Sequence, residues 1–349
     1  MPWYAYLLAP AAFLFHGITA VRNFLFDRGL IRSQKSPIPT LVVGNLSVGG
    51  TGKTPWVEFL VRQLRDEVAV GTLSRGYGRK TTGFLQVLPS SSAAEVGDEP
   101  LQLFTQFKEA IPVFVGEDRV GATQKIQQIF PDLQLLILDD AFQHRKLNPD
   151  FRIVLTPYSS PFSKDYLLPM GRLRESRAGA KRAEVVVVTK CPAELSQDEK
   201  NKLAGELAPY LNSEADLFFS SLTYGKPYQV SGPKQTDFTA VIALAGLANN
   251  EPFFTYCKQH FAVVDTFSFS DHYAYKPEDA TRILEVLGQE KGKNAVLLTT
   301  EKDAVKLKSL AATEMWSKIS IFALPIQVAI EPSQEERLLQ RLRKNLLHP

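Results

Sequence analysis

The sequence predicts an α/β protein in which helices cover both faces of a mostly parallel sheet, followed by a second, smaller α/β domain. Two observations lead to this prediction. Stretches typical of strands alternate with stretches typical of helices along most of the chain, which is the pattern of parallel sheets. The chain also has 349 residues, more than a single hydrophobic core usually covers, so we expect two domains.

The composition is that of an ordinary folded protein and excludes few classes of function. Hydrophobic residues make up 44% and charged residues 22%, and the formal net charge of +3 does not require a nucleic-acid partner. Cys191 and Cys257 lie far apart without a C-x-x-C spacing. They indicate a reducing compartment and provide no cysteine-based metal site.

The strongest local motif is a glycine-rich loop between an apolar run, residues 41–43, and a helix predicted over 56–64. Glycines let consecutive backbone N–H groups surround an anion, and the helix directs its positive dipole end at the same place. The predicted nucleotide-binding residues are Ser47, Val48, Gly49, Gly50, Thr51, Gly52, Lys53 and Thr54. Lys53 is placed to contact the β- and γ-phosphates, and the Thr54 hydroxyl to bind Mg²⁺. Ser47 replaces the first glycine of G-x-x-x-x-G-K-[ST], but the context predicts a P-loop NTPase-like sandwich.

Two segments that follow the loop each have two readings. A strand predicted over 68–73 precedes Arg75 and Arg79, at the strand end where ligands bind in open α/β sheets. These arginines either contact phosphate or belong to a solvated turn. Asp98 precedes a helix predicted over 99–107. It is placed either as the N-cap of that helix or as a carboxylate that accepts a proton from an attacking hydroxyl, and spacing alone favours the cap.

A pair of acids follows residues 133–138, which are predicted to form a strand buried on both faces. A strand over 111–115 and a helix that starts near Arg119 and runs to 130 precede it. Asp139 and Asp140 occupy the Walker-B position, where a carboxylate holds Mg²⁺ directly or through water. Because adjacent side chains of an extended chain point in opposite directions, we expect only one of the two acids to face the metal.

The most basic stretch of the chain, residues 167–182, lies between strands predicted over 151–156 and 185–189. This stretch suits either an anionic substrate group or a solvated surface, and both readings stay open. Thr189 and Lys190 are similar to the start of a guanine-reading N/T-K-x-D element, but Pro192 occupies the position of its aspartate. That difference argues against a GTPase.

The remaining elements predict the domain organisation. A helix over 197–211 completes the first domain, and residues 225–235, rich in Gly, Pro, Lys and Gln, are predicted to form a linker. The second unit is predicted to contain strands at 238–245, 262–267, 295–300 and 319–324 and helices at 251–260, 277–289 and 302–310. We therefore expect a P-loop domain over 27–224, a smaller α/β domain over 236–325, and a C-terminal helix over 326–349 that returns to the first domain. Ser333 and Glu336 fit a capping box at the start of this helix.

The N-terminal residues 1–21 carry no Asp, Glu, Lys or Arg. No positive segment precedes them, which argues against a signal peptide, and Pro10, His16 and Gly17 weaken a membrane-spanning helix. We expect residues 1–26 to form an apolar helix that associates with a membrane in the plane of its interface. A helix packed on the first domain is the alternative.

Asp271 and His272 form an acid–histidine pair in a loop of the second unit. His272 is either a loop residue with satisfied hydrogen bonds or a base oriented by a neighbouring acid. The pair taken alone favours the first reading. Residues 299–303, TTEKD, form a second polar strand end in the same unit.

Several motifs, in this order, resemble the tetraacyldisaccharide 4′-kinase family, the lipid A 4′-kinases. They are GNLSVGGTGKTP at 44–55, SRGYG at 74–78, GDEP at 97–100, LDDAFQH at 138–144, LPMGRLRE at 168–175 and DHY at 271–273. The resemblance covers nearly the whole chain, and the serine at position 47 belongs to the family's own motif. It implies a kinase that uses ATP and Mg²⁺ to phosphorylate the 4′-hydroxyl of a tetraacylated glucosamine disaccharide 1-phosphate, a lipid A precursor, giving lipid IVA. It also implies a location on the cytoplasmic face of the inner membrane of Gram-negative bacteria.

The resemblance implies roles for individual residues as well. Asp98 becomes the general base and His272 its partner, against the readings that spacing alone favours. Lys53 and Thr54 match the phosphate-loop pair, and Asp139 and Asp140 match the acids that handle Mg²⁺. The residues implied around the active site are Asn45, Arg75, Arg119, Arg174 and Glu175. Since the base and its partner belong to different domains, closure of the domains over nucleotide is expected to assemble the site.

Two other functions stay as alternatives. One is a nucleotide-driven switch or metallochaperone built on a similar loop, and the other is a peripheral membrane ATPase without a lipid substrate. Val48 stands where such switch proteins often carry a lysine, and Pro192 stands where GTP users need an aspartate. Both residues argue against the switch, whereas only a test for phosphorylated lipid separates the kinase from the ATPase.

Overall fold

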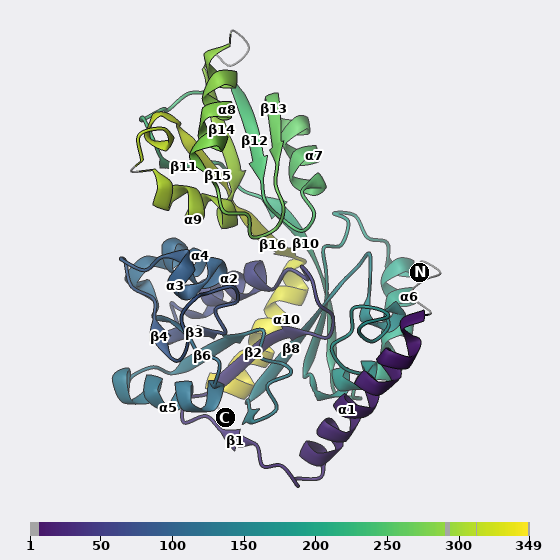
Figure 1. The fold of residues 1–349 in the computed structure, drawn as a ribbon. Helices are drawn as coiled ribbons and strands as arrows, with labels where there is room; N and C mark the ends of the chain where they lie inside the picture. The colour runs from purple at the N-terminus through teal and green to yellow at the C-terminus, as the bar shows by residue number, and fades with distance from the viewer. Residues whose placement is uncertain (1–6, 290–293, 312, 348–349) are drawn as a thin grey trace.

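The computed structural model describes residues 7–289, 294–311 and 313–347, and it contains a larger and a smaller α/β unit (Figure 1). The larger unit is built on a nine-stranded sheet with the strand order β16-β10-β9-β8-β2-β6-β3-β5-β4. In that order the strands are Ile326–Ile330, Asp216–Tyr224, Val185–Thr189, Phe151–Pro157, Thr40–Asn45, Leu135–Asp139, Val70–Ser74, Val113–Val115 and Leu85–Gln86. Only the outermost pairs, β16 with β10 and β4 with β5, are antiparallel.

Every residue of the central strands β2, β6 and β9 is buried. Their side chains face two separate hydrophobic clusters, one on each side of the sheet. One cluster packs against α2 (Lys53–Leu64), α4 (Asp98–Phe107) and α10 (Pro332–Leu342). The other packs against α5 (Arg119–Ile129) and α6 (Gln197–Leu207). Helices on both faces of a mostly parallel sheet confirm the predicted fold class.

The smaller unit repeats this architecture on a five-stranded sheet with the order β11-β15-β14-β12-β13. Its strands in that order are Tyr228–Ser231, Ile321–Leu324, Ala295–Thr300, Ala240–Ala245 and Ala262–Ser268. Helix α7 (Glu251–His260) packs on one face, and α8 (Pro277–Gly288) and α9 (Glu301–Leu310) pack on the other. The helices and strands predicted for this unit form within a few residues of their expected bounds.

Two antiparallel strands, β10 and β16, join the units (Figure 1), and here the structure corrects several predictions. The expected linker 225–235 contains β11, which pairs with β15 of the smaller sheet. The segment 326–349 begins with a strand, because the alternating side chains of Ile326–Ile330 fit the sheet edge beside β10. Helix α10 then begins at Pro332, and the Ser333 hydroxyl donates to Glu331 instead of forming a capping box.

Shorter elements complete the described chain. The strands β1 (Gln34–Lys35) and β7 (Leu147–Asn148) form a small parallel pair, and α3 (Ala93–Val96) precedes α4. The 3₁₀-helices are η2 (Lys108–Ala110), η3 (Phe162–Lys164), η4 (Arg177–Arg182), η5 (Ala208–Tyr210) and η7 (Trp316–Lys318), and a π-helical turn, η8 (Arg343–Leu347), follows α10.

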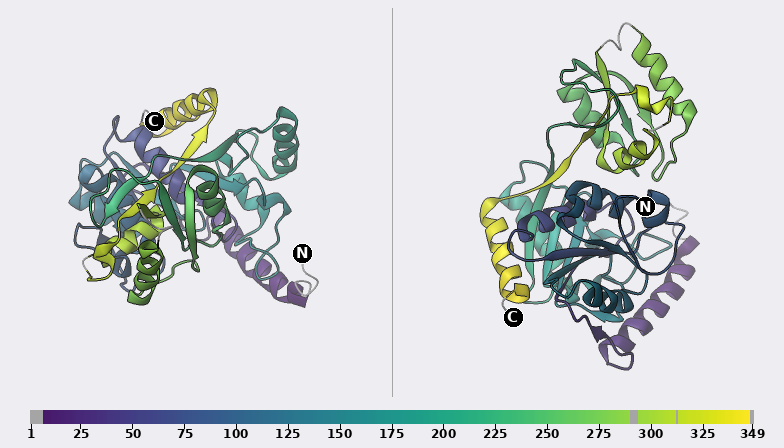
Figure 2. Two further views of the ribbon diagram at one scale, coloured as in Figure 1. Left: turned by 90° about the horizontal axis from the view of Figure 1, so that it is seen from above. Right: turned by 90° about the vertical axis from the view of Figure 1, so that its left-hand side faces the viewer.

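Helix α1 (Ala9–Asp27) lies along the outside of the larger unit, on the side opposite α10 in the right-hand view of Figure 2. Its buried residues are Ala12 and Thr19, whereas many of its apolar side chains are exposed. Among the helices of the described residues, none combines the length and the hydropathy needed to cross a membrane. Residues 1–6 of the predicted N-terminal helix lie outside the described residues.

Candidate active site

The glycine-rich loop connects the end of β2, at Asn45, to the start of α2, at Lys53. Gly49 and Gly52 have φ angles of +108° and +88°, which glycine adopts without strain. Gly52 is the N-cap residue, so the helix begins three residues earlier than predicted, and Lys53 and Thr54 form its first turn. The N-terminal dipole end of α2 and the open glycine backbone therefore face the same space, as an anion site requires.

Side chains from neighbouring strands hold the loop in shape. Asn45 Nδ2 donates to Thr51 Oγ1 at 2.9 Å, inside the loop. From the end of β9, Thr189 Oγ1 donates to the Thr51 carbonyl and Lys190 Nζ donates to the Gly50 carbonyl, both at 2.7 Å. Because these bonds turn the carbonyl oxygens outward, the loop is preorganised for an anion before any nucleotide binds.

The two acids after β6 differ in conformation and in environment. Asp139 is the last residue of the strand and is 2% exposed, and among the described residues its Oδ1 has no hydrogen-bond partner. Asp140 has a φ angle of +50°, so the chain leaves the extended conformation there, and the expectation of two successive extended residues was wrong. The turn directs Asp140 toward the glycine-rich loop, where its Oδ1 lies 3.9 Å from Lys53 Nζ.

The surroundings move the pKa values of these acids in opposite directions. Burial, together with the negative charges of Glu99 and Asp140, raises the pKa of Asp139 well above its ordinary value. Burial also acts on Asp140, but Lys53 and the hydrogen bonds of Arg174 outweigh it and lower the pKa of that carboxyl. The positive charges of Lys53 and Arg119 act against the rise in the pKa of Asp139 without outweighing its burial, whereas Asp140 forms ion pairs with Lys53 and Arg174.

Arg174, in the basic stretch 167–182, contacts Asp140 and the end of β2. Its guanidinium forms a fork on Asp140, with N–O distances of 2.7 and 3.1 Å, and it also donates to the carbonyl and the side-chain oxygen of Asn45. The segment that carries it runs beside the glycine-rich loop, since Val48 N donates to Arg172 O and Arg174 N donates to Leu46 O. The stretch is therefore a wall of the site and not a solvated surface at this point.

Glu175 faces away from the loop and is fully buried. Its carboxylate accepts hydrogen bonds from Gln143 Nε2, from Arg182 and from Asn23 Nδ2 of α1, all at 2.8 to 3.0 Å. Gln143 Nε2 also donates to the carbonyl of Asn45. Glu175 thus connects the N-terminal helix with the end of β2.

Arg119 and Arg75 lie near the acid pair on the other side. Arg119 is buried at the start of α5 and donates to the Gly116 carbonyl. Burial lowers its pKa to about 10, although Asp139 and Asp140 act in the opposite direction. Arg75 is exposed, but it lies close enough to Arg119 to contribute to that lowering. Both arginines therefore add positive charge to the sheet edge that holds the glycine-rich loop.

The smaller unit meets this edge at Asp98. Asp98 is the first residue of α4, and Gly97 is the N-cap, so the interpretation of Asp98 as the cap was wrong. Its Oδ2 lies 3.0 Å from His272 Nδ1 and 3.1 Å from Lys306 Nζ. His272 sits in a turn with a φ angle of +57°, after β13, and its ring is 5.5 Å from that of Tyr77. An acid of one unit is thus paired with two bases of the other.

The sequence did not single out three charged residues at this site, namely Lys190, Glu99 and Lys306. Lys190 belongs in the sequence to an incomplete guanine-reading element, and its contact with the glycine-rich loop depends on the adjacency of β9, β8 and β2. Glu99 carried the weak signal of standing beside Asp98. No pattern in the sequence pointed to Lys306, because its contact with Asp98 requires α9 of one unit to lie against α4 of the other.

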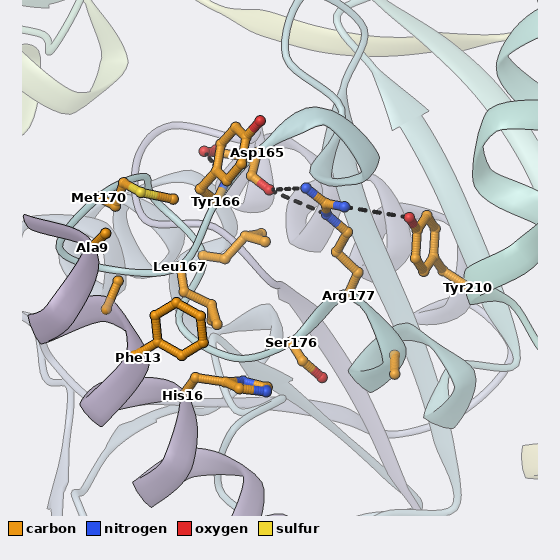
Figure 3. Close-up of a pocket in the computed structure, with 13 residues that line it drawn as sticks. Ala9, Phe13, His16, Asp165, Tyr166, Leu167, Met170, Ser176, Arg177 and Tyr210 are labelled. Atoms are coloured by element: carbon orange, nitrogen blue, oxygen red, sulfur yellow. Dashed lines mark hydrogen bonds between the residues drawn. The ribbon is translucent and has the colours of Figure 1, made fainter. Parts of the chain in front are cut away.

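An apolar cavity of about 400 Å³ lies between α1 and the loop that precedes Arg174 (Figure 3). Phe13 and His16 project from α1 toward that loop. The other lining residues are Ala9, Ala12, Asp165, Tyr166, Leu167, Met170, Leu173, Ser176, Arg177, Ala178 and Tyr210. On the side of the cavity away from α1, Arg177 donates to the Asp165 carbonyl at 2.8 Å and contacts the Tyr210 hydroxyl at 3.4 Å (Figure 3). The cavity thus offers mostly hydrocarbon surface beside a helix with an exposed apolar face.

Three comparisons relate this chain to known proteins. A family model described as Tetraacyldisaccharide-1-P 4′-kinase matches residues 4–343. A tetraacyldisaccharide 4′-kinase of Cytophaga hutchinsonii is 40% identical over 339 residues, which cover 95% of this chain and 93% of the relative. One from Flavobacterium psychrophilum is 40% identical over 324 residues, 92% of this chain and 91% of the relative. The LpxK protein of Aquifex aeolicus, crystallised in complex with ATP, superimposes with a TM-score of 0.75 at 30% identity, over 97% of this chain and 99% of that one.

Proposed function

This chain belongs to the tetraacyldisaccharide-1-P 4′-kinase family, and on that premise we infer that it transfers the γ-phosphate of ATP to the 4′-hydroxyl of a tetraacylated glucosamine disaccharide 1-phosphate. It is therefore a phosphotransferase with an alcohol group as acceptor, which acts in lipid A biosynthesis. One observation supports the assignment of roles. The Asp98 carboxylate contacts His272 at the same sheet edge that presents the glycine-rich loop. A phosphate donor and a proton acceptor are thus brought to one place.

We propose that residues 47–54 bind the phosphates of ATP and that Asp139 and Thr54 hold Mg²⁺. The partnerless Oδ1 of Asp139 and its raised pKa support this choice of acid, because both describe a buried oxygen suited to a cation. No group of three His, Cys, Asp or Glu fit for a metal occurs within residues 7–289, 294–311 and 313–347, so phosphate oxygens and water would complete the ligands. When bound, Mg²⁺ neutralises charge on the β- and γ-phosphates.

The cationic side chains neutralise the phosphate charge that Mg²⁺ leaves. Lys53 is held 3.9 Å from Asp140 at the start of α2, where it contacts the transferred group. Arg174 keeps Asp140 in its turn and binds the end of β2, so it positions the loop rather than the phosphate. Arg119 and Arg75 add positive charge to the acceptor side, and Asn45 supports the loop through Thr51.

Asp98 is proposed as the general base that accepts the proton of the 4′-hydroxyl. Its position at the first turn of α4 leaves it near the surface between the two units, where an acceptor can reach it. His272 donates to the carboxylate and so keeps it oriented. Because the base and its partner lie on different units, movement about β10 and β16 controls whether the pair is formed.

We further propose that α1 rests on the cytoplasmic face of a Gram-negative inner membrane. Its outward apolar side chains support this: Leu14 is 68%, Ile18 62% and Val21 60% exposed. The apolar cavity beside Phe13 and Leu167 is suited to an acyl chain of the substrate (Figure 3). Through Asn23, Glu175 and Gln143, the same helix is linked to the end of β2.

The test is transfer of label from [γ-³²P]ATP and Mg²⁺ to a tetraacylated disaccharide 1-phosphate in detergent micelles, with Lys53→Ala as the control. We expect a labelled lipid that the control does not form. Label recovered only as inorganic phosphate would contradict the lipid kinase and favour the ATPase, and nucleotide binding without turnover would favour the switch.

A further inference from the structure

Lys306 is the second cation that contacts the carboxylate of Asp98, and the sequence motifs do not include it. We propose that Lys306 is a positioning residue for phosphoryl transfer, which together with His272 holds one oxygen of Asp98 and so presents the other to the acceptor hydroxyl. This proposal rests on the proposed function, in which Asp98 is the base, and adds a residue to the same site.

The contacts at Asp98 converge on a single oxygen. Lys306 Nζ lies 3.1 Å and His272 Nδ1 lies 3.0 Å from Oδ2. Within the part of the chain that the structure describes, no hydrogen bond reaches Oδ1. A carboxylate with one partner is able to rotate about its Cβ–Cγ bond, whereas two partners from different elements define its plane. Oδ1 is thereby left as the free acceptor with a fixed direction, which a general base requires.

Lys306 is itself held in place and is not a surface lysine that happens to reach an acid. Its side chain is only 12% exposed, and its Nζ lies 3.4 Å from the carbonyl of Tyr273 and 3.9 Å from Asp303 Oδ1. Asp303 is fully buried and accepts hydrogen bonds from Gly246 N and Thr300 Oγ1. The ammonium therefore has a fixed anchor in the smaller unit, and Asp98 is the partner that the larger unit supplies.

The positive charge of Lys306 adds a second effect. Its ammonium lies in contact with Asp98 Oδ2, so it attracts the negative charge that the base carries. The other titratable groups around this contact are Asp303, which faces Lys306, Tyr275, which senses the charge of Asp98, and Glu99, which follows Asp98 in the first turn of α4. Neither the acids nor a neutral tyrosine supplies positive charge, so removing Lys306 leaves the base with less positive charge around it, and protons compete better for Asp98 as the pH falls.

The experiment compares Lys306→Met and Lys306→Arg with the wild-type chain in the lipid phosphorylation assay at pH 5.5 and pH 8.5. Lys308→Met is the matched control, because Lys308 lies on the same helix and is exposed. Affinity for ATP–Mg²⁺ and the melting temperature are measured for each variant, since these report on the phosphate loop and on folding.

We expect Lys306→Met to lose about tenfold to a hundredfold in kcat, with a greater loss at pH 5.5, while its ATP affinity stays that of the wild type. Lys306→Arg keeps the charge, so its ratio of rates at the two pH values should match the wild type even where its rate is lower. Equal losses at both pH values, or an unchanged rate, would overturn the proposal. Wild-type protein without lipid phosphorylation would instead refute the function itself, so the two failures are distinguishable.

Discussion

Replacement of Glu58 by glutamine should stabilise the protein at alkaline pH and have little effect at acidic pH. Glu58 lies on α2 and is 1% exposed. Its Oε1 accepts a hydrogen bond from Gln102 Nε2 at 2.8 Å, and Arg62 lies 3.9 Å from Oε2. Burial and the negative charge of Glu301, across the contact between the units, raise the pKa of Glu58 to about 8.

The direction of the effect follows from proton binding. The folded chain binds the Glu58 proton more tightly than the unfolded chain, so this group stabilises the fold below pH 4.5, and that stability is lost as the pH rises to about 8. The rise of the Glu58 pKa from 4.5 to about 8 corresponds to a loss of at most about 5 kcal/mol in the free energy of unfolding. Glutamine has the shape of the protonated acid and no charge to bury, so the variant avoids this loss.

The assay is the melting temperature of wild type and Glu58→Gln at pH 5 and pH 9. At pH 9 we expect the variant to melt higher by roughly 5–10 °C, and at pH 5 the two should agree within about 2 °C. Glu109→Gln, at an exposed acid of the same unit, controls for the change in net charge. A variant that is less stable than wild type at pH 9, or equally shifted at both pH values, would refute the reasoning.

Three further predictions concern the site and the membrane. Asp98→Asn should lower kcat by about 10² to 10⁴-fold with unchanged ATP affinity, since it removes the base alone; near-wild-type turnover would contradict the role. Asp139→Asn should raise the Mg²⁺ concentration needed for half-maximal rate, measured by MgCl₂ titration, and an unchanged requirement would shift the metal to Asp140. Leu14→Asp combined with Ile18→Asp should abolish sedimentation with anionic vesicles, whereas persistent binding would locate the contact away from α1.

The elements that the sequence predicted are those with strong local signals. The valine run of β9, the apolar run before Asp139 and the glycine loop each identify a strand or turn from a few adjacent residues. The same holds for most helices of the smaller unit, because their periodic apolar residues bury against one sheet.

The sequence was least informative where an element depends on distant partners. β10 was not predicted, and β16 was taken for part of a helix. β10 is stabilised as a strand by β9 and β16, and β16 by β10 across the connection between the units, so neither depends on adjacent residues alone. The contact of Lys306 with Asp98 and the hydrogen bond from Asn23 of α1 to Glu175 could not be predicted either, because both join segments far apart in the chain. The turn at Asp140 likewise arises from its contacts with Lys53 and Arg174.

The most direct measurement of the central claim is the position of the new phosphate on the lipid. Wild-type protein is incubated with ATP, Mg²⁺ and the tetraacylated disaccharide 1-phosphate, and the product is examined by ¹H–³¹P correlation NMR. We predict a second phosphorus signal coupled to the proton on carbon 4′, and none with Lys53→Ala. A phosphate on another hydroxyl, or a product with only the 1-phosphate signal while ATP is consumed, would contradict the assignment of this chain as a 4′-kinase.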